Sequence, residues 1–138
     1  NDSRLSVELI VDGHHLPFEK VQELFASIGD RIIAVSDAMA AAGNGDGMYT
    51  IGALPVEVKD GVARLTSNQK LAGSTLTISQ AFTNLITHCG LTLAQAVHAT
   101  STQAAQVLGL KDRGTIAIGM RADLLSYNSS NQSITTIN

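Results

Sequence analysis

The stretch IIAVSDAM, residues 32–39, decides the fold of this chain. A short run of apolar, mostly β-branched residues follows Arg31 and ends before a loop of small residues, which predicts a central strand covered on both faces. A carboxylate at the end of such a strand is costly unless its charge is used. Parallel barrels and doubly wound folds carry catalytic groups at that end of their strands. Asp37 is therefore a catalytic candidate, and the alternative is that it caps the following loop.

Two predicted elements precede this strand and indicate that it runs parallel to an earlier strand. The sequence predicts a strand over Val7–Val11 and a helix over Phe18–Ile28, in which apolar residues recur at spacings of three and four. Gly29 is expected to end the helix. Strand, helix and strand in this order predict a right-handed parallel βαβ unit, and hence an α/β fold.

In the middle of the chain the hydrophobic pattern changes to a period of two, which indicates antiparallel strands. Helical patterns follow. The turn at Lys59-Asp60-Gly61 is typical of a hairpin. Turns and short strands are expected after Gly109, closing with a strand-like run over Ser133–Ile137. The expected strands are Met48–Ile51, Leu54–Lys59 and Val62–Thr66, and the expected helices are Thr77–His88, Thr92–Thr100 and Thr102–Leu108.

Composition narrows the class of protein. With 138 residues, 44% hydrophobic and 15% charged, the chain is expected to be one modest globular domain. No apolar run approaches the ~20 residues of a membrane span. A net charge of −3 and the absence of a Lys/Arg cluster argue against nucleic-acid binding. The single cysteine, Cys89, is expected to be a small buried side chain in a protein of the reducing cytoplasm.

Strand-like runs stand at both ends of the chain. This pattern suggests that neighbouring strands are missing, so we expect either assembly with a missing N-terminal part or a homo-oligomer. The alternative is that the two runs are edge strands of a small complete domain.

Four motifs carry a family resemblance. They are DGHH at 12–15, SDAM at 36–39 with Gly43 after it, LAGS at 71–74, and GTIAIGMRADL at 114–124. In this order they resemble the C-terminal third of the N-acetylglucosamine-6-phosphate deacetylase family, within the amidohydrolase superfamily. The last motif is widespread in the superfamily, whereas the first three in this order and spacing are distinctive.

The resemblance implies a metal-dependent (β/α)₈ barrel with a small β-sandwich built from both chain ends. Residues 1–110 would be the C-terminal part of the barrel and residues 111–138 part of the sandwich. The complete enzyme would hold a divalent metal, zinc or iron. Its family ligands, a glutamate and two histidines, would precede Asn1, so no metal ligand is expected in this chain.

The resemblance also assigns roles to residues. Asp37 matches the family's acid/base aspartate, which takes a proton from the attacking water and later delivers one to the departing amine. His15 matches a histidine that holds the sugar phosphate, although without the resemblance an ordinary polar turn would be preferred for the histidine pair. The expected substrate-binding residues are Asp12, Gly13, His14, His15, Leu71, Ala72, Gly73 and Ser74.

Three functions remain open at this point. The favoured one is a fragment of a deacetylase of N-acetylglucosamine 6-phosphate, an amino-sugar phosphate, which would be inactive alone. The second is a deacetylase of N-acetylgalactosamine 6-phosphate, since the residues that distinguish the two sugars could lie outside this chain. The third is an inactive remnant with a structural or binding role.

Overall fold

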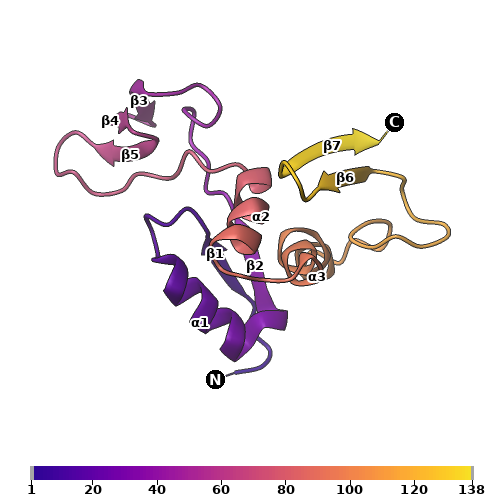
Figure 1. Ribbon diagram of the computed structural model, residues 1–138. Helices are drawn as coiled ribbons and strands as arrows, with labels where there is room; N and C mark the ends of the chain where they lie inside the picture. The colour runs from indigo at the N-terminus through magenta and orange to yellow at the C-terminus, as the bar shows by residue number, and fades with distance from the viewer. Residues whose placement is uncertain (1, 138) are drawn as a thin grey trace.

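The computed structural model of the protein describes residues 2–137 and has the expected α/β character (Figure 1). No helical segment among these residues combines the length and apolarity that a membrane crossing needs. The strands are β1 (Val7–Ile10), β2 (Ile32–Val35), β3 (Gly47–Ile51), β4 (Leu54–Lys59), β5 (Val62–Leu65), β6 (Leu124–Asn128) and β7 (Ser133–Ile137). The α-helices are α1 (Phe18–Ile28), α2 (Ile78–Thr87), α3 (Leu93–Val97) and α4 (Gln103–Val107).

The parallel unit predicted at the N-terminus is confirmed. β1 pairs with β2 in parallel register, from Val7 opposite Ile32 to Ile10 opposite Val35. Helix α1 connects them and has the predicted bounds. Its apolar face buries Val21 and Phe25 against the strands, because residues four apart lie on one side of a helix. The unit sets the carboxyl ends of both strands at one edge.

Gly29 ends α1, as predicted, but not by the expected geometry. A glycine after a helix commonly adopts a left-handed conformation. Here Gly29 stays right-handed, with a φ of −44°, and the chain continues through a 3-10 turn, Gly29–Arg31, directly into β2. The helix and the strand are thus joined without a loop.

The two helices expected between Thr92 and Leu108 form one continuous helical segment, so the predicted break between them is wrong. A π turn, His98–Thr102, joins α3 to α4. The hydroxyl of Thr100 donates to the carbonyl of Ala96 at 2.7 Å, a bond that lets a polar side chain remain inside a helix. After the π turn the buried Gln103 reaches Ser6 ahead of β1, at 3.2 Å.

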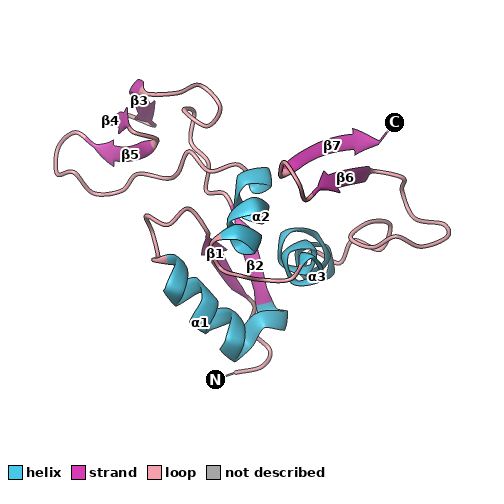
Figure 2. Ribbon diagram, in the orientation of Figure 1, coloured by secondary structure: helices cyan, strands magenta, loops and turns pink. Residues whose placement is uncertain are grey.

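The described residues contain two separate apolar clusters. The larger one joins β1, β2, α1, α2 and the segment from α3 to the π turn. The smaller one lies within the three-stranded antiparallel sheet β3–β4–β5 and contains Val56, Val58 and Ala63. Figure 2 shows this sheet standing apart from the helices. The hairpin turn between β4 and β5 is confirmed, with Asp60 and Gly61 both at positive φ.

The C-terminal hairpin returns to the larger cluster. β6 and β7 pair in antiparallel register, and Tyr127 and Ile134 pack against the core. The ring of Tyr127 meets the ring of Phe82 edge-on, with centroids 5.1 Å apart. The hairpin is therefore attached to α2 rather than to the three-stranded sheet (Figure 1).

Candidate functional site

Two loops leave the same edge of the β1–β2 pair. Ile10 lies opposite Val35 in the last pair of the two strands, so the segments that follow, beginning at Val11 and Ser36, start side by side. The carboxyl edge of parallel strands is where α/β folds bind ligands. We name the residues gathered there, Asp12–His15, Asp37 and Gly73–Ser74, the strand-end site.

Asp12 organises the first loop. One of its carboxylate oxygens accepts hydrogen bonds from the backbone N–H groups of His14 and His15, each at 2.9 Å. The other lies 2.8 Å from Nδ1 of the His15 ring. Burial alone would raise the pKa of the Asp12 carboxyl, but the hydrogen bonds from the backbone of His15 and His14 and from the His15 ring outweigh burial and lower it. Nδ1 of His15 is engaged in this way, and Nε2 is the ring atom left to meet a ligand.

Gly13 and His14 complete this loop in different ways. Gly13 has a φ of +77°, and a Cβ added there would lie 2.8 Å from the Phe18 ring. Only glycine fits this turn, which runs close over the start of α1. The side chain of His14 is exposed, whereas that of His15 is partly buried.

Asp37 stands on an exposed turn immediately after β2, with a φ of +46°. This left-handed conformation is uncommon for a residue other than glycine and points to a local constraint. The constraint comes from Ser74, whose backbone N–H donates to the carbonyl of Asp37 at 2.8 Å. Ser74 also forms a parallel bridge with Ala38.

The loop predicted to contact substrate divides into two parts. Leu71 bridges Arg64 of β5, and the buried Ala72 donates its N–H to Ala63 at 3.1 Å, so both belong to the three-stranded sheet. Gly73 and Ser74 lie against the backbone around Asp37. The structure thus brings Gly73 and Ser74 to the strand-end site, while contact of any of the four residues with substrate stays a prediction.

The sequence analysis missed Asn84, which lies in the middle of α2. Asn84 is 6% exposed, and its side-chain amide donates to the carbonyl of Val11 at 2.8 Å. It thereby holds the residue just before Asp12. An amide on the buried face of an amphipathic helix is the signal that could have identified it, because buried polar groups require partners.

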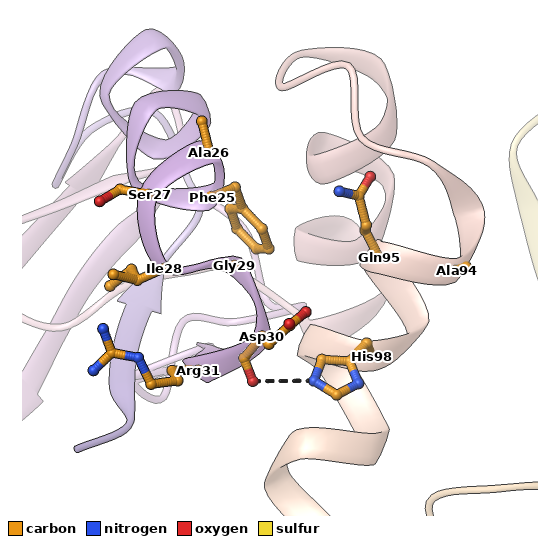
Figure 3. Close-up of a pocket in the computed structure, with 10 residues that line it drawn as sticks. All are labelled: Phe25, Ala26, Ser27, Ile28, Gly29, Asp30, Arg31, Ala94, Gln95 and His98. Atoms are coloured by element: carbon orange, nitrogen blue, oxygen red, sulfur yellow. Dashed lines mark hydrogen bonds between the residues drawn. The ribbon is translucent and has the colours of Figure 1, made fainter. Parts of the chain in front are cut away.

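An open depression lies away from the strand-end site. It has a volume of about 720 Å³ and lies between the end of α1 and the start of α3 (Figure 3). His98 lines it and contacts the backbone carbonyl of Asp30 through Nε2, at 3.2 Å. This depression adjoins the amino end of β2, and none of the predicted site residues lines it.

A metal does not fit the residues at hand. Within residues 2–137 no group of three or more His, Cys, Asp and Glu side chains is close enough to hold a metal ion. Tight zinc sites use three or four protein ligands.

Comparison with known proteins identifies the family. The model of the Amidohydrolase family matches residues 62–137. The chain belongs to the amidohydrolase family. Enzymes of this family generally depend on a divalent metal.

Relatives of this amidohydrolase share one reaction type in their names. A protein of Escherichia coli K12, provisionally named an N-acetylgalactosamine-6-phosphate deacetylase, is 37% identical over 93% of this chain and 77% of its own. An N-acetylglucosamine-6-phosphate deacetylase of Lysinibacillus sphaericus is 41% identical over 86% of this chain, but over 31% of its own.

A solved structure of similar fold comes from Mycobacterium smegmatis. It is an aspartate-to-alanine variant of N-acetyl-D-glucosamine-6-phosphate deacetylase in complex with N-acetyl-D-glucosamine-6-phosphate, with a TM-score of 0.91 and 36% identity. The match covers 99% of this amidohydrolase chain and 37% of the solved one. Apart from the E. coli K12 protein, the chain thus spans about a third of the length of these relatives.

Proposed function

We propose that this chain is part of an enzyme that removes the acetyl group from N-acetylglucosamine 6-phosphate, giving glucosamine 6-phosphate and acetate. The observation that carries the proposal is the strand-end site, in which the Asp37 carboxylate follows β2 at the same edge at which the Asp12–His15 loop follows β1. The family membership and the names of the relatives agree with an amide hydrolase.

Asp37 is proposed as the acid/base. Its carboxylate accepts a proton from water as the water oxygen attacks the acetyl carbon. It then returns a proton to the amide nitrogen as the C–N bond breaks, so that acetate and the amine leave. Its exposed position after β2 leaves room for the water and the substrate. Because the proton returns to the product, the carboxylate ends the cycle in its starting state.

His15 is proposed to bind the phosphate by donating a hydrogen bond from Nε2–H, which requires both ring nitrogens to carry a proton in the complex. Its Nδ1 contact with Asp12 fixes the orientation of the ring and keeps a proton on Nδ1. The neighbouring backbone of Asp12, Gly13 and His14 lines the same part of the pocket. A phosphate accepts hydrogen bonds through several oxygens, which suits a site made of one ring and a tight backbone turn.

Within the whole protein, residues 1–110 are proposed to form the last part of a (β/α)₈ barrel and residues 111–138 part of a β-sandwich. The parallel β1–β2 unit with its crossover helix supports this division, as does the β6–β7 hairpin, which forms a two-stranded sheet of its own. The metal, zinc or iron, would then be held by residues outside this chain. The single buried cysteine favours a location in the reducing cytoplasm.

N-acetylgalactosamine 6-phosphate is the second candidate substrate. The E. coli K12 relative, whose name carries that sugar, matches 77% of its own length, a larger share than the other relatives described. The two sugars differ in the orientation of one hydroxyl, so the chemistry proposed for Asp37 is the same for both.

The test uses a fusion enzyme in which this chain replaces the segment it matches in the M. smegmatis deacetylase. Deacetylation of both sugar phosphates is measured by release of acetate, for the fusion enzyme and for the 138-residue chain alone. We expect activity from the fusion enzyme only, loss of that activity in Asp37→Asn, and an unchanged circular dichroism spectrum. A folded fusion enzyme without activity on either sugar, or an Asp37→Asn variant with normal turnover, would contradict the proposal.

A further inference from the structure

Ser74 uses all of its polar atoms within the protein. It is 3% exposed. Its backbone N–H donates to Asp37 at 2.8 Å, and its carbonyl accepts from the N–H of Met39 at 2.9 Å. Its hydroxyl donates to the carbonyl of Ser36 and accepts from the N–H of Leu76 at 3.0 Å. A substrate would find no free hydrogen-bonding group on this residue.

Two of these hydrogen bonds hold the backbone on either side of Asp37. The carbonyl of Ser36 belongs to the peptide group before Asp37, and the carbonyl of Asp37 belongs to the peptide group after it. Ser74 holds the first through its hydroxyl and the second through its backbone N–H. Fixing both peptide groups fixes φ and ψ of Asp37, and therefore the direction in which its side chain leaves the backbone.

The backbone conformation in which Asp37 is held is itself energetically unfavourable. Asp37 has a φ of +46°, and a left-handed residue other than glycine costs about 1 kcal/mol or more. Such a conformation persists only where the surroundings enforce it. Gly73 contributes from the same side, because a Cβ added there would lie 3.1 Å from the carbonyl oxygen of Asp37 and 3.3 Å from Cβ of Met39. The Gly73–Ser74 pair thus fits closely against the backbone on which Asp37 stands.

We infer that Ser74 is a positioning residue for Asp37, holding the carboxylate in its working direction through the Ser36 carbonyl, rather than a residue that contacts the substrate. This inference rests on the function proposed above. It assigns the Ser74 hydroxyl to the turnover step and leaves substrate binding to the Asp12–His15 loop.

The experiment compares three substitutions in the fusion enzyme. Ser74→Ala removes the hydroxyl and keeps the backbone hydrogen bonds, whereas Ser74→Thr keeps a hydroxyl. Thr75→Ala is the matched control, because the neighbouring Thr75 hydroxyl also donates to a backbone carbonyl, but to that of Gly61 in the three-stranded sheet. Calorimetric titration with the product glucosamine 6-phosphate gives the dissociation constant and the number of binding-competent sites, so that turnover is expressed per competent site.

For Ser74→Ala we expect turnover per competent site to fall ~10- to 100-fold, the range produced by a misplaced catalytic group. The dissociation constant should stay within about 2-fold, since a loss of one hydrogen bond to the ligand would exceed that. Ser74→Thr should restore most of the turnover, and Thr75→Ala should leave turnover unchanged.

Three outcomes would overturn the inference. The first is a Ser74→Ala variant that loses competent sites but turns over normally at those that remain, which indicates a purely structural role. The second is a weakened dissociation constant with normal turnover, which places Ser74 on the substrate. The third is an equal loss in Thr75→Ala. If Ser74→Ala does not fold, the isosteric Ser74→Cys, a weak donor, decides by the same criteria. An inactive parent fusion enzyme would instead contradict the proposed function itself.

Discussion

The side-chain amide of Asn84 donates a 2.8 Å hydrogen bond to the backbone carbonyl of Val11, which joins the middle of α2 to the last residue before the Asp12 loop. The carbonyl of the same amide accepts from the side chain of Gln80 at 2.8 Å. Both Asn84 and Val11 are buried, so water cannot replace either partner. The position of the Asp12–His15 loop therefore depends on a helix far along the sequence.

Replacing Asn84 should destabilise the protein measurably. Asn84→Ala leaves the Val11 carbonyl buried without a donor, which costs about 1–3 kcal/mol. We expect the midpoint of urea unfolding of the 138-residue chain to fall accordingly. Gln80→Ala is the control on the same helix, and because Gln80 is exposed its loss should be smaller. Equal stability of the two variants would show that the Asn84–Val11 bond contributes nothing.

Replacing His15 should affect binding of the phosphate more than turnover. In the fusion enzyme His15→Ala removes a charge-assisted hydrogen bond worth about 1.5–3 kcal/mol, so KM for the phosphorylated sugar should rise about 10- to 100-fold while kcat changes little. The unphosphorylated sugar serves as the matched substrate, since its KM should not respond. A variant with normal KM and slow turnover would place His15 at the reacting carbon instead.

Asp12 should make the stability of the chain depend on acid. Its folded-state pKa is lowered because the hydrogen bonds from His15 and His14 outweigh the effect of burial. Such a carboxyl stabilises the fold above its unfolded pKa of about 4, and the contribution is lost as the pH falls through the folded value. The difference in unfolding free energy between wild type and Asp12→Asn should therefore be largest near neutral pH and shrink toward about pH 2.

The control for Asp12 is Glu57→Gln on the exposed face of β4. Its difference from wild type should be small at every pH. Chemical denaturation at a series of pH values measures both variants. If the Asp12→Asn difference is the same at neutral and acidic pH, the carboxylate is not linked to folding through its protonation.

Cys89 should be unreactive in the folded chain and should limit stability at high pH. Burial, with a smaller effect from Glu19, raises the pKa of the Cys89 thiol to about 11. The unfolded thiol ionises near pH 8.5. This contribution to stability is thus complete below about pH 8.5 and is lost as the pH rises toward the folded value. Cys89→Ala should flatten that alkaline decline, and a thiol reagent at pH 8 should label wild type only after urea is added.

Local patterns predicted the elements best. The spacing of Val21, Leu24, Phe25 and Ile28 gave α1 its correct bounds, because burial of one face decides an amphipathic helix. The Asp12–His15 contact also joins residues three apart and could be anticipated as a pair. By contrast, two helices were expected with a break between Thr100 and Thr102, where the chain in fact continues through a π turn that includes a side-chain hydrogen bond.

Contacts between distant segments could not be predicted in the same way. The contact of Ser74 with substrate stays a prediction, whereas the bond from its hydroxyl to Ser36, far away in sequence, was not anticipated. The partner of Asn84 is farther still. The type of a residue does not predict which distant backbone carbonyl its side chain will bond to. The two hydrogen bonds form only because the folded chain packs α2 and the Gly73–Ser74 turn against the strand ends.

The bridge between Ala38 and Ser74 has one more consequence, for the segment between them. Residues 39–73 leave and rejoin the strand-end site at neighbouring positions, and the three-stranded sheet they form has its own small core. The entropy of closing such an excursion grows only slowly with its length. We therefore expect the sheet to tolerate changes in length and sequence, provided that Ala38, Met39, Gly73 and Ser74 keep the turn that carries Asp37 in place.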